Sequence, residues 1–159
     1  MRLITFAFIL LSATEVHSKC IKLCDVDWWE KASSTQVIDA IKSGEDVNGQ
    51  GVNGQGEGFF PLHLAAWKST ASNVKILLMY GANVEAVAFA SENSWRPLHT
   101  AAMMGTVETV RALISAGADV SAKDKIDFTP LHWAGLREKS DLINVLIDAG
   151  ADINDLKYE

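Results

Sequence analysis

The 159-residue sequence has little proline, little cysteine and no cluster of basic residues. With three prolines, 48% hydrophobic and 21% charged residues, its composition is that of a folded domain and not of a disordered chain. Asp and Glu outnumber Lys and Arg by 20 to 14, which gives a formal net charge of −6. An acidic chain without a basic cluster is unsuited to nucleic acid or to an anionic membrane surface, so we expect neither as a partner.

The sequence also lacks an apolar run long enough to cross a bilayer. The only candidate, residues 3–11, is shorter than the roughly 20 residues that a spanning helix needs. Its position after Arg2 is typical of a secretory signal peptide covering residues 1–18, cleaved after Ser18 or, as a second choice, after Ala13. A buried N-terminal helix is the alternative. We therefore expect an exported protein, periplasmic or secreted, with no membrane attachment once the signal is removed; the few cysteines and single compact domain slightly favour the periplasm.

Only two cysteines are present, Cys20 and Cys24. Two isolated cysteines do not supply the four ligands of a structural zinc site. Their spacing places them one turn apart if the segment is helical, and a disulfide between them would close a very short loop. The sequence leaves their redox state open.

Internal repetition is the strongest feature that is present. The tripeptide Pro-Leu-His begins at Pro61, Pro97 and Pro130, and a glycine motif of the type Gly-Ala-Asp-Val begins 20 residues later in each case, at the positions Gly81, Gly117 and Gly150. Self-similarity with a period near 33 residues predicts a solenoid of stacked units and not a single wrapped core.

Each unit carries two helical segments. Apolar residues recur three, four and seven positions before each glycine, which places them on one helical face. The same offsets before Gly44 fall on Val37, Ala40 and Ile41, so a degenerate first unit is predicted at residues 24–48. We expect Ser34 or Thr35, Ser72 or Asn73, Thr106, and Ser140 or Asp141 to cap the second helix of the four units.

The motifs PLHLAA, PLHTAA and TPLHWAG, closed by GANVEA, GADVSAKD and GADIND, resemble ankyrin repeats. The resemblance covers nearly all of residues 19–159, as the degenerate unit and full repeats at about 57–89, 93–125 and 126–156. It implies an all-α solenoid of stacked helix–turn–helix units with hairpin loops. It also implies a structural role for His63, His99 and His132, which hold adjacent loops. The family's threonine before proline is kept only at Thr129, and its replacement by Phe60 and Arg96 should weaken a local cap.

Two connections between units are longer than the third, by four residues after Gly44 and by three after Gly81. Such insertions either form part of a binding face or are simply tolerated. Residues 46–57 also have the spacing of a twelve-residue calcium loop. However, the closing motif of the repeat already accounts for its first residues, and Gln50 stands at the fifth place. We predict no metal and no cofactor.

No nucleophile, acid and base converge in the pattern, so an enzyme is not expected. The positions that the repeat leaves free are instead rich in aromatic, Met and basic residues, which are favoured at protein interfaces. They lie two before each proline, directly after each Ala-Ala or Ala-Gly pair, and on one hairpin: Phe59, Trp95, Phe128, Trp67, Lys68, Met103, Met104, Leu136, Arg137 and Lys125. In the resembled family this surface is concave and binds partners. The alternative is that some rings pack between repeats, with Phe59 and Phe128 as the first candidates.

The sequence therefore predicts a non-catalytic, monomeric protein that binds another protein through this aromatic and Met-rich surface. Two alternatives stay open. One is a secreted effector that engages a host protein, and the other is a structural protein that assembles with itself.

Overall fold

The computed structural model describes residues 20–52, 58–88 and 93–156. Its helices form four consecutive pairs, joined by longer connections, with one two-stranded antiparallel hairpin in the first connection. The elements are α1 (Val26–Trp29), α2 (Ser34–Lys42), β1 (Gly51–Val52), β2 (Gly58–Phe59), α3 (Pro61–Lys68), α4 (Ala71–Met79), α5 (Pro97–Met104), α6 (Val107–Ser115), α7 (Pro130–Leu136), α8 (Ser140–Asp148) and the 3₁₀ helix η1 (Ile153–Leu156).

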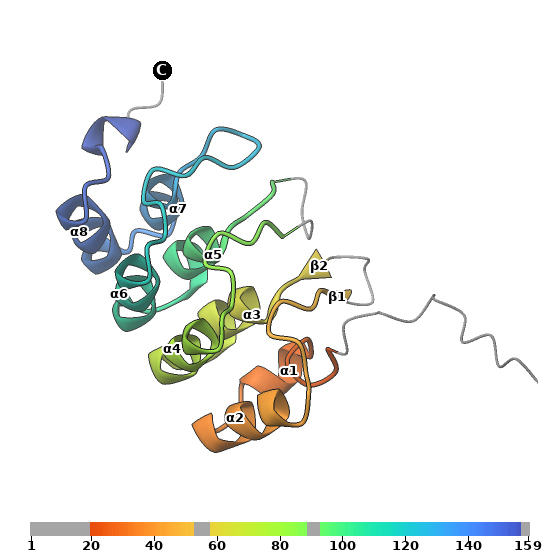
Figure 1. Ribbon diagram of the computed structural model, residues 1–159. Helices are drawn as coiled ribbons and strands as arrows, with labels where there is room; N and C mark the ends of the chain where they lie inside the picture. The colour runs from red at the N-terminus through yellow and green to blue at the C-terminus, as the bar shows by residue number, and fades with distance from the viewer. Residues whose placement is uncertain (1–19, 53–57, 89–92, 157–159) are drawn as a thin grey trace, which may run out of the picture.

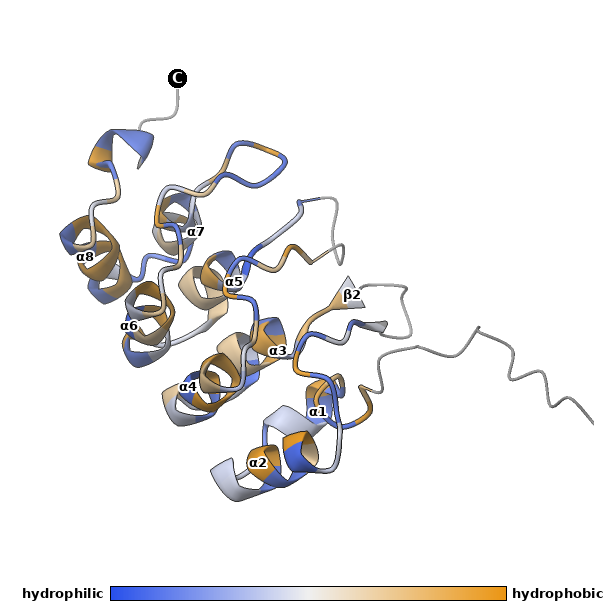
Figure 2. Ribbon diagram, in the orientation of Figure 1, coloured by the Kyte–Doolittle hydropathy of each residue, from blue (hydrophilic) through white to orange (hydrophobic). Residues whose placement is uncertain are grey.

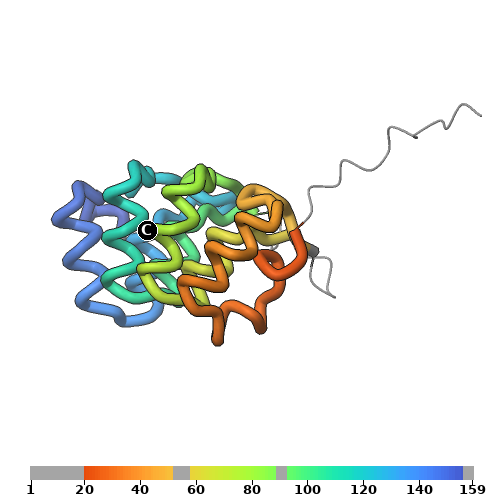
Figure 3. Tube along the Cα trace, turned by 60° about the horizontal axis from the view of Figure 1, so that its bottom comes forward, coloured from red at the N-terminus to blue at the C-terminus, as the bar shows by residue number. Residues whose placement is uncertain are grey.

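The helices are stacked in two rows. The inner row contains α1, α3, α5 and α7, and the outer row contains α2, α4, α6 and α8 (Figures 1 and 3). The three connections between pairs are here called fingers 1 to 3 (residues 45–60, 82–96 and 118–129), and their described parts project to the same side of the helices (Figure 1). This is the predicted all-α solenoid, in which each unit contacts only its neighbours.

The repeated sequence explains why each unit has the same local structure. Every inner helix of the three full repeats begins at a proline, whose missing N–H is not needed at the first helical position. Every outer helix is followed by a glycine with positive φ, between +88° and +102°, a conformation that other residues adopt only at a cost. Proline and glycine therefore set the start and the end of each helix pair.

Small residues in the inner row allow neighbouring repeats to approach closely. Ala65, Ala101 and Ala134 are fully buried, and the leucine of each Pro-Leu-His is at most 1% exposed. The outer row contributes buried Val74, Val110 and other apolar residues to the same core cluster. Helices of both rows include hydrophobic segments (Figure 2). The core is thus a continuous layer between the two rows of helices.

The predicted helix caps are only partly correct. Thr106 caps α6 as expected, through a bond from the N–H of Thr109 to its hydroxyl oxygen. The helices α2 and α4 begin earlier than predicted, with Ser33 and Thr70 as caps. In the fourth unit Lys139 occupies the cap position and makes no side-chain cap bond. Several residues with capping side chains follow one another in these turns. The spacing alone therefore does not show which of them has the extended backbone of an N-cap.

Within the described residues, no helix is long and apolar enough to cross a membrane.

Candidate protein-binding surface

Buried histidines attach fingers 2 and 3 to the inner helices that precede them. His63 Nε2 lies 3.0 Å from the carbonyl oxygen of Trp95, and His99 Nε2 lies 3.0 Å from that of Ala122. Burial lowers the pKa of His63 to about 4 and also lowers the pKa of His99. Both imidazoles are therefore neutral at pH 7 and donate from Nε2. The structural role implied for these two residues is confirmed.

The partners of the other imidazole nitrogen differ between the three repeats. Thr129 donates its backbone N–H to His132 Nδ1 at 3.1 Å, and its hydroxyl lies 2.9 Å from the same atom. Arg96 retains only the backbone bond, at 3.2 Å. In the first full repeat, where Phe60 precedes the proline, Nδ1 of His63 is buried and has no partner. Loss of the threonine thus weakens this local cap, as predicted from the sequence.

Polar side chains also join the base of one finger to the next. In the first finger, Asn48 donates its amide to the carbonyl oxygen of Gly81 at 2.9 Å and accepts the N–H of Asn83 at 2.8 Å. At the equivalent place in finger 2, Glu85 accepts the N–H of Asp119 at 3.0 Å and forms an ion pair with Arg96 at 2.9 Å. The fingers are therefore held in register along the stack.

An aromatic cluster that the sequence did not predict supports finger 3. The buried carboxylate of Asp124 accepts the indole N–H of Trp133 at 3.0 Å and the backbone N–H of Phe128 at 2.9 Å. The ring of Trp133 meets Trp95 edge to face at 4.8 Å between centroids, and Phe128 stacks on His132 at 4.9 Å. The sequence did carry one sign of this cluster, because Trp133 stands where the first full repeat has Leu64.

The structure divides the ten predicted site residues into two groups. Five of them pack partly against the core: Phe59, Trp67, Trp95, Met103 and Phe128. Phe59 and Phe128 were the expected members of this group. For Trp95 the sequence favoured exposure, but its ring packs between repeats against Trp133.

The remaining five differ in their exposure. Lys125, Leu136 and Arg137 are exposed, and Leu136 retains 54% of its accessible surface. Lys68 and Met104 are intermediate. Lys125 lies on finger 3 beside Ile126, which is 49% exposed, whereas the other four lie at the ends of the inner helices.

The inner helices bring three of the predicted pairs into equivalent places on successive repeats. These pairs are Trp67–Lys68 on α3, Met103–Met104 on α5 and Leu136–Arg137 at the end of α7, and together they form what we call the inner-helix stripe. Neighbouring inner helices pack directly on one another, so the pairs follow each other along the stack. At one end Lys68 pairs with Glu30 at 2.6 Å and lies 4.4 Å from the centre of the Trp67 ring. The stripe is therefore apolar, with a cation at each end.

Two other exposed apolar side chains lie away from the stripe. Met79 is 82% exposed and Tyr80 is 43% exposed, at the end of the outer helix α4. The repeat places these residues where other units have polar or small ones, such as Lys42 and Ser115. Sequence analysis did not single them out.

The described residues offer little support for metal chemistry. No three His, Cys, Asp or Glu side chains among them are placed to hold an ion. In the calcium-like segment, Asp46 already accepts the N–H of Asn48 at 2.8 Å, and Asn48 bonds to the next repeat. The second half of that segment, including Glu57, lies outside the described residues, as does the predicted signal peptide.

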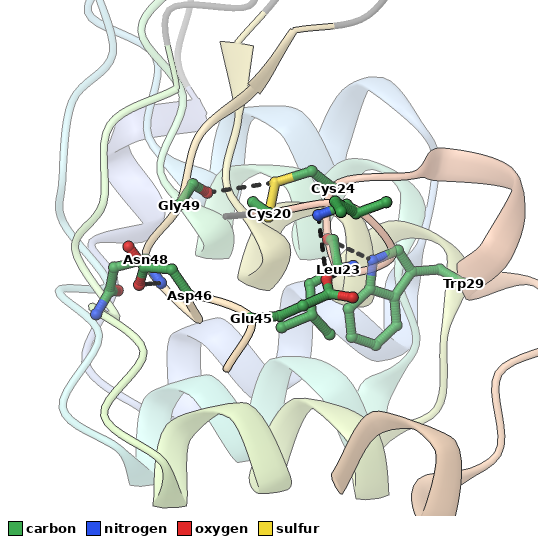
Figure 4. Close-up of a disulfide and its surroundings, with 9 residues drawn as sticks. Cys20, Leu23, Cys24, Trp29, Glu45, Asp46, Asn48 and Gly49 are labelled. Carbon is green, nitrogen blue, oxygen red and sulfur yellow. Dashed lines mark hydrogen bonds between the residues drawn. A yellow bond between two sulfur atoms is a disulfide. The ribbon is translucent and has the colours of Figure 1, made fainter. Parts of the chain in front are cut away.

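Cys20 and Cys24, whose state the sequence left open, form a disulfide with their Cα atoms 5.5 Å apart (Figure 4). The bridge closes a five-residue loop just before α1.

The paired helices, the projecting fingers and the histidine bonds define a repeat protein built of stacked helix pairs. A sequence profile for ankyrin repeats matches residues 62–157 in three copies, which is more than half of the chain. The chain belongs to the ankyrin-repeat family, and the predicted fold class is confirmed. Ankyrin repeats are generally protein–protein interaction modules and typically non-catalytic. No curated protein sequence matches the chain.

Proposed function

We propose that this chain binds another protein through the inner-helix stripe and the adjoining finger 3, as a rigid display surface without chemistry. The observation that carries the proposal is the stripe itself, with Trp67, the two methionines and Leu136 in equivalent places on three successive repeats. Large apolar residues at positions that the repeat leaves free are characteristic of interaction surfaces.

The framework supports a rigid mode of binding. The described parts of the fingers are held by the His63 and His99 bonds and by Asn48 and Glu85, so these parts lose little conformational freedom on association. Leu136 and Arg137 are the best-exposed members of the stripe, and we assign them the largest contribution to binding. Trp67 and Met103 also pack against the core, so their replacement should affect stability as well as binding.

Affinity capture from the native compartment, repeated with variants, tests the proposal. The double variant Leu136→Ala/Arg137→Ala should lose the captured partner while its circular dichroism and melting temperature stay close to those of the wild type. The matched control is Met79→Ala, which removes a still more exposed apolar side chain from the outer helix and should retain the partner. Capture that survives the double variant, or that fails only with Met79→Ala, would place the site elsewhere.

We also propose that the protein is exported and acts as a monomer. The Cys20–Cys24 disulfide supports export, because such bonds persist mainly in oxidising compartments. N-terminal sequencing of the mature protein should begin near Lys19, and a chain that still begins at Met1 contradicts export. Light scattering on the purified chain should give the monomer mass, whereas a larger mass would favour self-assembly.

A further inference from the structure

The disulfide loop inserts an apolar side chain into the first end of the stack. Leu23, within the loop, is fully buried, whereas nearby Lys22 and Asp25 are exposed. Trp29, also buried, donates its indole N–H to the carbonyl oxygen of Leu23 at 2.9 Å. The loop therefore covers the core at the first end of the stack, where the first repeat has no preceding neighbour. Figure 4 shows Leu23 beside Trp29.

A substitution in the repeat motif creates the other attachment of this loop. Glu45 occupies the position held by Ala82, Ala118 and Ala151 in the full repeats. Its buried carboxylate accepts the backbone N–H groups of Ile21 at 3.1 Å and Leu23 at 2.9 Å. The closed ring places both N–H groups on one acceptor, so these two bonds report directly on the shape of the loop.

The bridge also packs against finger 1. Cys24 Sγ lies 3.5 Å from the carbonyl oxygen of Gly49, and a Cβ built on Gly51 would lie 2.4 Å from Cys24 Cβ. Strand β1 can approach the bridge this closely only because residue 51 is glycine. Finger 1 and the loop therefore fit together in the oxidised form.

A short series of contacts leads from the loop to the inner-helix stripe. Trp29, bonded to Leu23, is the last residue of α1, and Glu30 follows it directly. Glu30 binds Lys68 at 2.6 Å, and Lys68 lies against Trp67. The position of one charged member of the stripe thus depends on the order of α1, a helix of only four residues that is too short to persist alone.

We propose that the Cys20–Cys24 loop is a redox-sensitive cap that couples the order of the first repeat to the stripe. A dithiol reductant transfers two electrons and two protons to the bridge: the S–S bond breaks, both cysteines become thiols, and the dithiol becomes a disulfide. The reduced loop no longer holds Leu23 and α1, and Glu30 separates from Lys68. The regulatory meaning of this coupling rests on the proposed function, but the coupling itself does not.

Hydrogen exchange on the purified chain, with and without dithiothreitol, tests the cap without any partner. We expect the amides of Ile21 and Leu23 to exchange about tenfold faster, or more, after reduction. Without the disulfide the opened loop has more conformations, so opening becomes more favourable. Amides in α5 should be unchanged. The double variant Cys20→Ser/Cys24→Ser should match the reduced wild type and show no response to dithiothreitol. Equal exchange of Ile21 and Leu23 in both redox states would overturn the proposal.

The coupling to the stripe has its own measurement, the rate at which an amine-reactive acylating reagent modifies Lys68. Reduction should raise this rate as the ion pair with Glu30 opens, and Lys75, an exposed lysine on α4, is the internal control. Faster exchange in the loop with an unchanged rate at Lys68 would show that the cap opens without reaching the stripe, and would overturn the coupling. Loss of partner binding in Leu136→Ala/Arg137→Ala is independent of both results.

Discussion

At the scale of single residues, buried polar groups decide how the repeats are joined. His63 is fully buried, donates Nε2–H to the carbonyl oxygen of Trp95, and leaves Nδ1 without a partner. Asp124 is also buried, yet three N–H groups surround its carboxylate, from Ile126, Phe128 and Trp133. A neutral imidazole and a fully bonded carboxylate are two ways to retain a polar side chain in an apolar layer.

The neutral state of His63 predicts that the fold weakens in acid. Its pKa is about 4 in the folded chain, because burial disfavours the imidazolium, against an ordinary value of 6.5. Between these values the unfolded chain binds more protons, so this contribution is complete above pH 6.5 and is lost as the pH falls towards 4. The loss should reach about 3 kcal/mol for the full shift, and His99 adds to it in the same direction.

Urea unfolding at pH 7.5, 6.0 and 4.5 measures this loss as a falling midpoint. An NMR titration of the His63 imidazole is the direct check. A side chain that titrates near 6.5 in the folded protein contradicts the assignment, whatever the unfolding curves show.

At the scale of elements, the junction between the first two repeats depends on one buried amide. Asn73, in α4, donates to the carbonyl oxygen of Ala32 at 2.9 Å and to Ser69 Oγ at 2.8 Å, and it accepts the hydroxyl of Ser34 at 2.8 Å. Three bonds thus attach the start of α2 and the turn before α4 to one side chain. The equivalent residue in α6 is Thr109, whose hydroxyl hydrogen-bonds to that of its own cap residue, Thr106, and not to the neighbouring repeat.

Replacing this amide should therefore loosen the first junction specifically. We expect Asn73→Ala to lower the free energy of unfolding by about 2–3 kcal/mol, because it removes three hydrogen bonds to part-buried partners. Chemical unfolding followed by circular dichroism measures the change. The control is Ser72→Ala, an exposed neighbour on the same helix, which should stay within about 0.5 kcal/mol of the wild type. Equal effects of the two variants would show that the Asn73 amide does not stabilise the junction between the first two repeats.

At the scale of the whole molecule, the stack is quasi-one-dimensional and its ends differ. The first end is closed by the disulfide loop and the last by η1, which packs on α7. Each repeat is stabilised only by its neighbours, so a terminal repeat has one interface fewer than an internal one. The last repeat should consequently open more readily than the middle of the stack.

A pair of matched core variants tests this one-dimensional behaviour. Leu113 in α6 and Leu146 in α8 occupy equivalent places, and both are fully buried. Each replacement by alanine should cost about 2–5 kcal/mol locally. In Leu146→Ala, hydrogen exchange should rise in α7 and α8 while α3 and α4 stay protected. In Leu113→Ala, protection should fall on both sides of the substitution. Uniform loss of protection along the chain in both variants would indicate a single cooperative core instead.

The candidate surface was predicted only in part, because contacts between side chains of different repeats cannot be read from the sequence. The spacing of Trp95 and Trp133 was visible in the sequence, but their edge-to-face contact depends on the distance between repeats. Trp95 was therefore expected to be available to a partner and is instead partly packed. Exposed Met79 was not predicted, because the candidates were taken from the inner helices and the fingers, whereas Met79 ends the outer helix α4.

The sequence by itself determined the fold, because proline, glycine and the apolar periodicity act within one unit and each unit repeats them. The repeated position of the histidines, together with the resemblance to the family, also indicated that they hold the following loops. Only the tertiary structure decided which free residues remain exposed, that Glu45 binds the first loop, and that Cys20 and Cys24 are joined. These depend on contacts at the irregular first unit and between unlike side chains, where no repeated pattern specifies the partner.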